Sequence, residues 1–253
     1  MTRSEIPAGL AEHLAQTALA SVDGHPPVDL HAVAASLGVS SISFDSDLVG
    51  DGFVEWDHTG RPAVTLAANG PLSRQRFTLA HELGHVLLEG PPGERRHRRP
   101  QLDPSAEETL CDRIAAGLLM PRPWVDRYAH RDRLNLSILR LVAQRAEVSL
   151  SAVAVRLGQV GARTSALLRW RRTESGRWIL LGCAGVPRHL GVAVSMPPKT
   201  ARTVERLGFR DTWLDIELDF GGQLQRVNAH GSRSGDRCIL FITHLKPADP
   251  MGS

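Results

Sequence analysis

The pentapeptide His81-Glu82-Leu83-Gly84-His85 is the feature of this sequence that most restricts its fold. Mostly apolar stretches at 77–80 and 86–88 flank it and predict a largely buried helix. On a helix, side chains four residues apart project from one face, so both imidazoles point the same way. Their buried nitrogens need polar partners. The segment therefore predicts either two core histidines satisfied by carbonyl groups or a site for a metal ion.

The order of residues in this pentapeptide favours the metal site. Two histidines separated by four positions, with a glutamate directly after the first, form the H-E-x-x-H pattern of zinc metalloproteases. Such a glutamate lies beside a water molecule at the open coordination position of the metal. We therefore predict that His81 and His85 are metal ligands and that Glu82 is the catalytic acid/base.

A third ligand is expected from the next helix, because catalytic zinc sites usually combine three protein ligands with one water. Glu108, Cys111 and Asp112 share one face of that helix. We expect Glu108 to bind the metal, and Asp112 to accept the remaining N–H of a ligand histidine. Glu107 is a rival ligand but lies one residue off this face. Cys111 is an alternative soft ligand, although a small buried side chain is the simpler interpretation.

Three stretches resemble the ImmA/IrrE family of metallopeptidases and, within it, the IrrE-like branch of radiation- and stress-response regulators. They are RQRFTLAHELGH at 74–85, ETLC at 108–111 and LLMP at 118–121. The likeness is strong over roughly residues 25–125, fair to about residue 160 and weak beyond that point.

The resemblance implies specific roles for the site residues. His81, His85 and Glu108 would be the zinc ligands, and Glu82 would be the catalytic acid/base. Members of the family commonly have Asn where this chain has Asp112. An aspartate still accepts an imidazole N–H, so this departure preserves the metal site but changes the local charge.

The resemblance also implies a function. It is that of a gluzincin-like, zinc-dependent metalloendopeptidase, with manganese as the alternative ion. The implied substrate is a helix-turn-helix repressor of the XRE type, whose cleavage derepresses stress-response or mobile-element genes. Two other functions stay open: a metal-bearing regulator that binds its partner without cutting it, and a DNA-binding transcription regulator. The presence of Glu82 argues against the first, since a pure binder needs no base beside the metal.

The chain has 253 residues, which is enough for two domains. We predict an α+β protein with three parts. The first, 1–128, is a zincin-like metallopeptidase domain, rich in helix with a small sheet. The second, 129–160, is a helical segment of helix-turn-helix shape. The third, 161–253, is an α+β domain that resembles a GAF-type sensor domain but is short for one.

The segment of helix-turn-helix shape bears on DNA binding. A recognition helix must present polar side chains to base edges. The second helix of this segment offers mainly Arg156 and Gln159 among alanine and valine residues. We therefore expect structural support or substrate docking here, and we do not expect direct DNA binding.

Periodicity and capping signals predict the individual elements. Helices are expected at 8–21, 30–37 with Asp29 as the cap, 73–89 with Ser73 as the cap and Gly90 as the end, 105–120, 134–146, 147–160 and 200–207. Strands are expected at 39–44, 53–56, 63–66, 169–172, 177–183, 192–196, 212–220 and 237–244.

Composition and charge narrow the remaining possibilities. The net charge is +3 with acidic and basic residues interspersed, which permits contact with nucleic acid but does not argue for it. No apolar run reaches the length of a membrane span, and no secretory leader is recognisable at the start of the chain. Three cysteines are too few for a disulfide framework. We expect a soluble cytoplasmic protein with no membrane partner.

Several isolated features carry less weight. The arginine-rich stretch 95–99 is expected to lie in a loop. Tyr128 and His130 are weak candidates for stabilising an oxyanion, and we expect both at the surface past a helix end. Cys183 and Cys238 lie in apolar strands and are expected to be buried. His189, His230 and His244 are far apart and are expected to have ordinary packing or surface roles.

Overall fold

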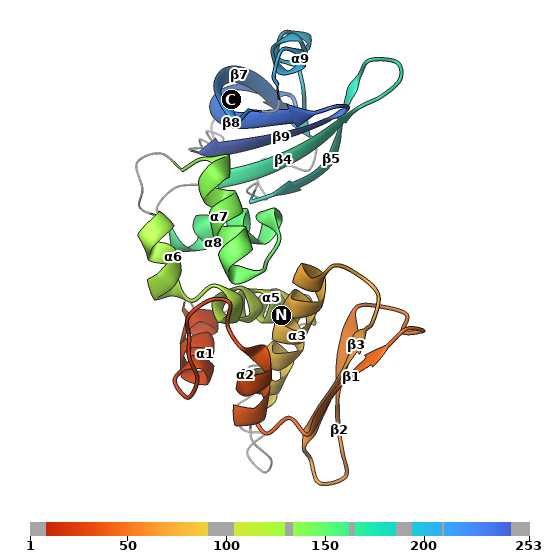
Figure 1. Cartoon of the computed structure of the whole chain (residues 1–253), viewed down its shortest axis with the longest axis vertical. Coiled ribbons are helices and arrows are strands. Elements are labelled where there is room, and N and C mark those ends of the chain that lie inside the picture. Colours follow the sequence, from red (N-terminus) through yellow and green to blue (C-terminus); the bar gives the residue numbers. More distant parts are fainter. Residues whose placement is uncertain are drawn as a thin grey trace, which may run out of the picture. The chain divides into compact units, whose positions relative to one another are not determined.

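A computed structural model describes residues 9–90, 104–129, 134–161, 165–185, 194–208 and 210–243. The stretch 95–99, His130, His189 and His244 lie outside these residues. The chain divides into two compact units. Unit 1 comprises 1–125 with 144–149, and unit 2 comprises 126–143 with 150–253. The expected mixture of helices and strands is confirmed, with a sheet-rich C-terminal part (Figure 1).

Unit 1 combines helices with one small sheet. Its helices are α1 (Leu10–Leu19), α2 (Leu30–Ser36), α3 (Leu72–Glu89) and α5 (Pro104–Leu119). Its strands are β1 (Ser41–Asp45), β2 (Gly52–Trp56) and β3 (Pro62–Ala67). In the sheet, β3 lies between the other two, parallel to β1 and antiparallel to β2. Helix α3 packs along β2 and β3, and α5 packs on α3 (Figure 1).

The structure confirms some of the helix caps and ends expected from the sequence. Asp29 caps α2, because its carboxylate accepts hydrogen bonds from the N–H groups of His31 and Ala32. Gly90 ends α3 with φ of 73°, a conformation that favours glycine. The expected cap at Ser73 is wrong. The helix begins one residue earlier, where the carbonyl of the extended Pro71 accepts the first helical hydrogen bonds.

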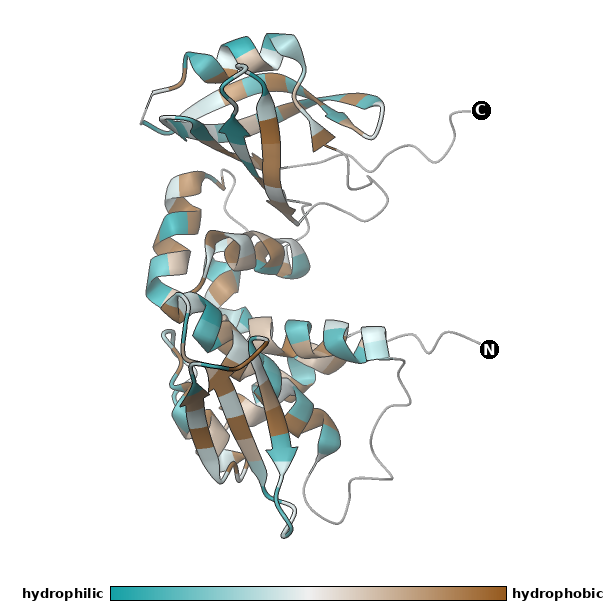
Figure 2. Cartoon of the chain, turned by 90° about the vertical axis from the view of Figure 1, so that its right-hand side faces the viewer, coloured by the Kyte–Doolittle hydropathy of each residue, from teal (hydrophilic) through white to brown (hydrophobic). Residues whose placement is uncertain are grey.

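Unit 2 is built on a six-stranded sheet in the order β5-β4-β9-β8-β7-β6, and its adjacent strands are antiparallel. The strands are β4 (Ser165–Arg172), β5 (Trp178–Ala184), β6 (Val194–Ser195), β7 (Thr212–Phe220), β8 (Gln223–Ser234) and β9 (Arg237–Thr243). Helix α9 (Pro198–Glu205) contributes Val204 to the apolar core on one face of this sheet. In Figure 2, hydrophobic and hydrophilic residues alternate along many of the strands, as expected for sheets with one packed face.

Three helices lie between these sheets in the sequence. They are α6 (Arg122–Ala129), α7 (Leu136–Ala146) and α8 (Leu150–Val160). Helix α8 packs on β4 and β5, and even its Arg156 is 3% exposed. This burial agrees with a packing role for the second helix of the pair. No helix in the described part of the chain is both long and apolar enough to cross a membrane.

Two expectations about single residues are wrong. Tyr128 is not at the surface past a helix end but lies within α6 and is buried. The reason is that Pro123, in the first turn, starts a further helix rather than preventing one. Cys183 is exposed, because it belongs to the outward-facing alternate positions of β5, whereas Cys238 is buried as expected.

Candidate metal centre

Helix α3 presents His81 and His85 on the same face. Their ring centroids are 5.0 Å apart, and the rings are tilted by 68°. The opposite side of the helix buries Leu79, Ala80 and Leu83 in unit 1, which fixes the rotation of the helix about its axis. Both imidazoles remain partly accessible, with side-chain exposures of 16% and 19%.

The carboxylate of Glu108, on α5, lies close to the Nε2 atom of each imidazole. One of its carboxylate oxygens is 3.1 Å from Nε2 of His81, and the other is 3.5 Å from Nε2 of His85. Two ligands bound to one tetrahedral zinc ion at about 2.0–2.1 Å lie about 3.3 Å apart. The separations between the Glu108 carboxylate and each Nε2 atom are therefore close to those expected for ligands of one ion, and two imidazoles with one carboxylate are a set of donors typical of catalytic zinc.

Two further carboxylates of α5 lie beside the other ring nitrogens. Asp112 Oδ1 is 3.0 Å from Nδ1 of His81, and Glu107 Oε1 is 3.4 Å from Nδ1 of His85. If each Nδ1 carries the proton, each Nε2 keeps its lone pair for a metal. Burial opposes the charged form of His81. The hydrogen bond with Asp112 and the negative charges of Asp112, Glu82 and Glu108 favour the charged form more strongly than burial disfavours it. The net effect is a raised pKa of His81.

Glu82 lies beside this group in a cleft. Its side chain is buried, with 6% exposure, and it lines a cavity of about 640 Å³ together with the two histidines and Glu108. Burial raises the pKa of the Glu82 carboxyl, the neighbouring histidines lower it, and Glu108 raises it further, with a net increase. Strand β2 forms part of the cavity wall, with Phe53 and Trp56 among the lining residues.

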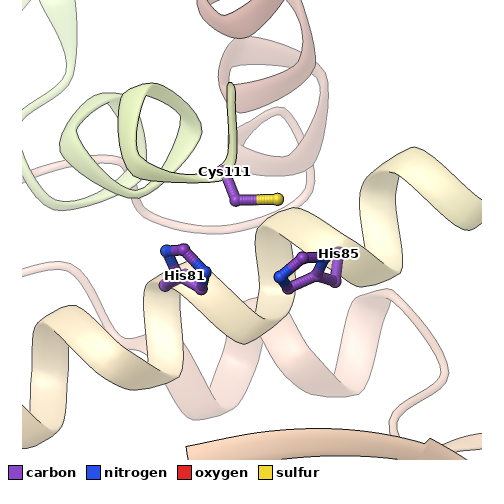
Figure 3. A group of neighbouring side chains, drawn as sticks. All are labelled: His81, His85 and Cys111. Atoms are coloured by element: carbon purple, nitrogen blue, oxygen red, sulfur yellow. The ribbon is translucent and has the colours of Figure 1, made fainter. Parts of the chain in front are cut away.

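Cys111 lies next to the histidines. Figure 3 shows its side chain near both imidazoles, and the potential ligand atoms of the three residues lie within 4.8 Å of one another. The cysteine is fully buried where α5 passes Gly84 of α3. Burial, followed by the charges of Glu108 and Glu107, raises the pKa of its thiol well above the ordinary range. In the metal-free protein the thiol is thus protonated at neutral pH, whereas a metal binds the thiolate.

The structure thus brings His81, Glu82, His85, Glu108 and Asp112 into one cleft. The sequence indicates Glu107 only as a rival ligand and contains no signal for its contact with Nδ1 of His85. The motif also contains no signal for the wall formed by β2. Tyr128 belongs to unit 2, while the centre belongs to unit 1.

The part of the chain that carries this centre is similar to known proteins. Residues 33–158 match the model of the IrrE N-terminal-like domain, a peptidase family. This stretch includes both helices that carry the centre. The segment belongs to the IrrE N-terminal-like family. The expected family resemblance is thereby confirmed.

Two curated relatives of this chain are radiation response metalloproteases of Deinococcus. The protein of Deinococcus radiodurans is 32% identical over 146 residues, covering 53% of this chain and 42% of the relative. That of Deinococcus deserti is 31% identical over 140 residues, covering 54% and 49%. The matched region thus spans less than half the length of each relative. A solved structure of a Mycobacterium tuberculosis transcriptional regulator aligns with 92% of this chain and 74% of its own, with a TM-score of 0.49 and 12% identity.

Proposed function

We propose that this chain is a zinc-dependent endopeptidase of the gluzincin type. The observation that carries the proposal is the meeting of both histidine Nε2 atoms at the carboxylate of Glu108, with the buried Glu82 in the same cleft. Two imidazoles and one carboxylate leave a position for water on a four-coordinate metal. In this proposal His81, His85 and Glu108 are the ligands, and manganese is the alternative ion.

The proposed reaction divides the work among these residues. A bound zinc ion would lower the pKa of a water molecule and polarise the carbonyl of the scissile bond. Glu82 accepts a proton from the attacking water and passes it to the leaving amine. A hydrogen bond between Asp112 and Nδ1 of His81 fixes the orientation of the imidazole ring.

The proposed substrate is a helix-turn-helix repressor of the XRE type. The family resemblance supports this substrate, and the names of the Deinococcus relatives support a role in a stress response. We further propose that 1–128 is the peptidase domain and that 129–160 supports it or docks substrate. Residues 161–253 would form a sensor domain of GAF-like type. The burial of α8 supports packing rather than DNA reading by its helix-turn-helix-like pair.

The test compares the zinc-loaded protein with its Glu82→Gln variant in lysate of the organism that encodes it. Mass spectrometry identifies peptide N-termini that form only with the unchanged protein. We expect cleavage within a helix-turn-helix protein and its loss in the variant, by at least 100-fold, because general acid–base catalysis contributes about 10²–10⁴-fold. The variant should still bind zinc. Equal cleavage by both proteins would refute the role of Glu82. Absence of cleavage with zinc bound, before and after oxidative stress or DNA damage, would favour a regulator that does not cut.

A further inference from the structure

Glu107 lies beside Nδ1 of His85, the ring nitrogen that does not face Glu108. Its Oε1 atom lies 3.4 Å from Nδ1 of His85, and its side chain is 17% exposed, compared with 60% for Glu108. A mostly buried carboxylate is costly unless it is paired. The imidazole of His85 offsets part of this cost when its Nδ1 carries the proton.

The three acidic residues Glu107, Glu108 and Asp112 project from α5 in different directions. Successive residues on a helix are rotated by about 100°. Relative to Glu108, Asp112 is therefore rotated by about 40° in one direction and Glu107 by about 100° in the other. Glu108 reaches between the two rings, and its neighbours reach one ring each, Asp112 that of His81 and Glu107 that of His85.

The histidine nitrogen that each carboxylate faces distinguishes a metal ligand from a residue that supports one. The two Nε2 atoms lie against one carboxylate, that of Glu108, so we expect one ion bound by this carboxylate to reach both rings. The two Nδ1 atoms lie against different carboxylates, Asp112 and Glu107. A metal bound by Glu107 and by Nδ1 of His85 would lose this shared position.

We infer that Glu107 is a positioning residue, which holds His85 with its Nδ1 protonated and its Nε2 directed at the metal. The inference rests on the metal site of the proposed function. A carboxylate behind a ligand histidine fixes the ring and raises its basicity, and loss of such a partner typically lowers metal affinity by about 10–100-fold. With Asp112, Glu107 then gives both histidines a carboxylate partner from the same helix.

The experiment measures zinc affinity of the full chain by competition with a chelator, for Glu107→Ala and Glu107→Gln. We expect a loss of about 10–100-fold for the alanine variant. We expect a smaller loss for glutamine, because its amide oxygen still accepts the Nδ1–H. Glu55→Ala is the matched control, since it removes an exposed carboxylate from β2, whose neighbours line the same cleft. Thermal unfolding of the metal-free variants checks that they fold.

The absorption spectrum of the cobalt(II)-substituted protein provides a second readout that reports the ligands directly. Glu107→Ala should keep the intensity and positions of the visible bands, whereas Glu108→Ala should change them through loss of an oxygen ligand. Cys111→Ala should leave the bands unchanged. Spectra of Glu107→Ala that match those of Glu108→Ala would make Glu107 a ligand and overturn the inference.

Zinc affinity of Glu107→Ala within twofold of the unchanged protein would also overturn it. An equal loss of zinc affinity in Glu55→Ala would overturn the inference too, because removal of any negative charge near the cleft would then have the same effect. These readouts do not depend on cleavage. A chain that binds zinc but cuts no protein would therefore refute the proposed function while leaving this inference standing.

Discussion

Gly84 sets the distance at which the two helices of the metal centre pass each other. A Cβ atom at this position would lie 3.1 Å from Cα and 3.2 Å from Cβ of Cys111. Real side chains are rarely this close to a neighbour, and here the neighbour includes backbone, which cannot rotate away. Cys111 follows Glu108 by three residues on α5. A side chain at position 84 would therefore move α5, and with it the carboxylate of Glu108.

Gly84→Ala tests this residue. We expect zinc affinity to fall roughly tenfold, the lower end of the loss of about 10–100-fold that is typical when the support of a metal ligand is disturbed, because the shift here is a few tenths of an ångström. Stability of the metal-free protein should change little, since alanine favours the helix by about 1 kcal/mol and offsets part of the strain. Chelator competition and thermal unfolding measure the two quantities.

The matched control is Gly158→Ala in α8. The nearest atom to its added Cβ would be Ser165 Oγ at 3.6 Å, an ordinary contact. This variant should gain up to about 1 kcal/mol of stability and keep its zinc affinity. If Gly84→Ala bound zinc as tightly as the unchanged protein, close approach at Gly84 would have no part in forming the site.

The composition of the centre is largely predictable from the sequence, because it depends on spacing along two helices. The four-residue step from His81 to His85 is local, and so is the face shared by Glu108 and Asp112. The contact of Glu107 with His85 is different in kind. It depends on how α5 is rotated against α3, which is set by packing between residues distant in the sequence and leaves no signal near Glu107.

At the scale of elements, helix α7 begins with its free N–H groups satisfied from two directions. The side chain of Asn135 accepts a hydrogen bond from the N–H of Ile138, as a usual N-cap does. Nδ1 of His230 on β8 accepts one from the N–H of Leu136 at 3.2 Å. A strand thus supplies part of the cap of a helix that precedes it by about 90 residues in the chain.

This contact requires His230 to be neutral at Nδ1. The side chain is buried, and Trp213 packs against it edge-on at 4.8 Å. Burial lowers the pKa of His230, Asp211 opposes this shift, and Arg140 adds to it, with a net decrease. The unfolded chain therefore binds a proton at His230 at higher pH than the folded chain does. Stability from this residue is present above the unfolded pKa of about 6.5 and is lost as pH falls below it.

His230→Asn tests the effect, because its side-chain oxygen can still accept the N–H of Leu136 but does not titrate. We expect the free energy of unfolding to fall less steeply for the variant than for the unchanged protein as pH falls from 7.5 to 5.5. His230→Leu removes the acceptor and should lose about 1–3 kcal/mol at pH 7.5. Denaturant unfolding at several pH values measures both. Parallel pH profiles of His230→Asn and the unchanged protein would contradict the argument.

Elements with a strong period or a clear cap are predictable from this sequence, and elements that depend on their neighbours are not. Helices α2 and α3 and strands β2, β3 and β7 form close to the expected residues. Strand β8, at Gln223–Ser234, was not expected. It is polar at many positions and contains Gly231, and it is a strand because β7 and β9 pair with it on both sides.

At the scale of the whole molecule, each of the two units buries apolar residues. Helices α3 and α5 bury Leu83, Leu110 and Ile114 in unit 1. Unit 2 has its own cluster between α9 and its sheet, around Trp170 and Leu240. All the proposed metal ligands belong to unit 1. The free energy of metal binding therefore stabilises unit 1 directly. It stabilises unit 2 only if the unfolding of the two units is coupled.

Calorimetry of the full chain can detect this separation. We expect two unfolding transitions, of which zinc raises one. A ligand at 100 times its dissociation constant stabilises the form that binds it by about 2.7 kcal/mol, which corresponds to roughly 10 °C for a unit of this size. A chelator should reverse the shift, and Glu108→Ala should abolish it while leaving the other transition in place. If both transitions rose together, or the chain unfolded in one transition that zinc shifted as a whole, the units would be thermodynamically coupled, and unit 2 would be able to influence the metal centre through stability alone.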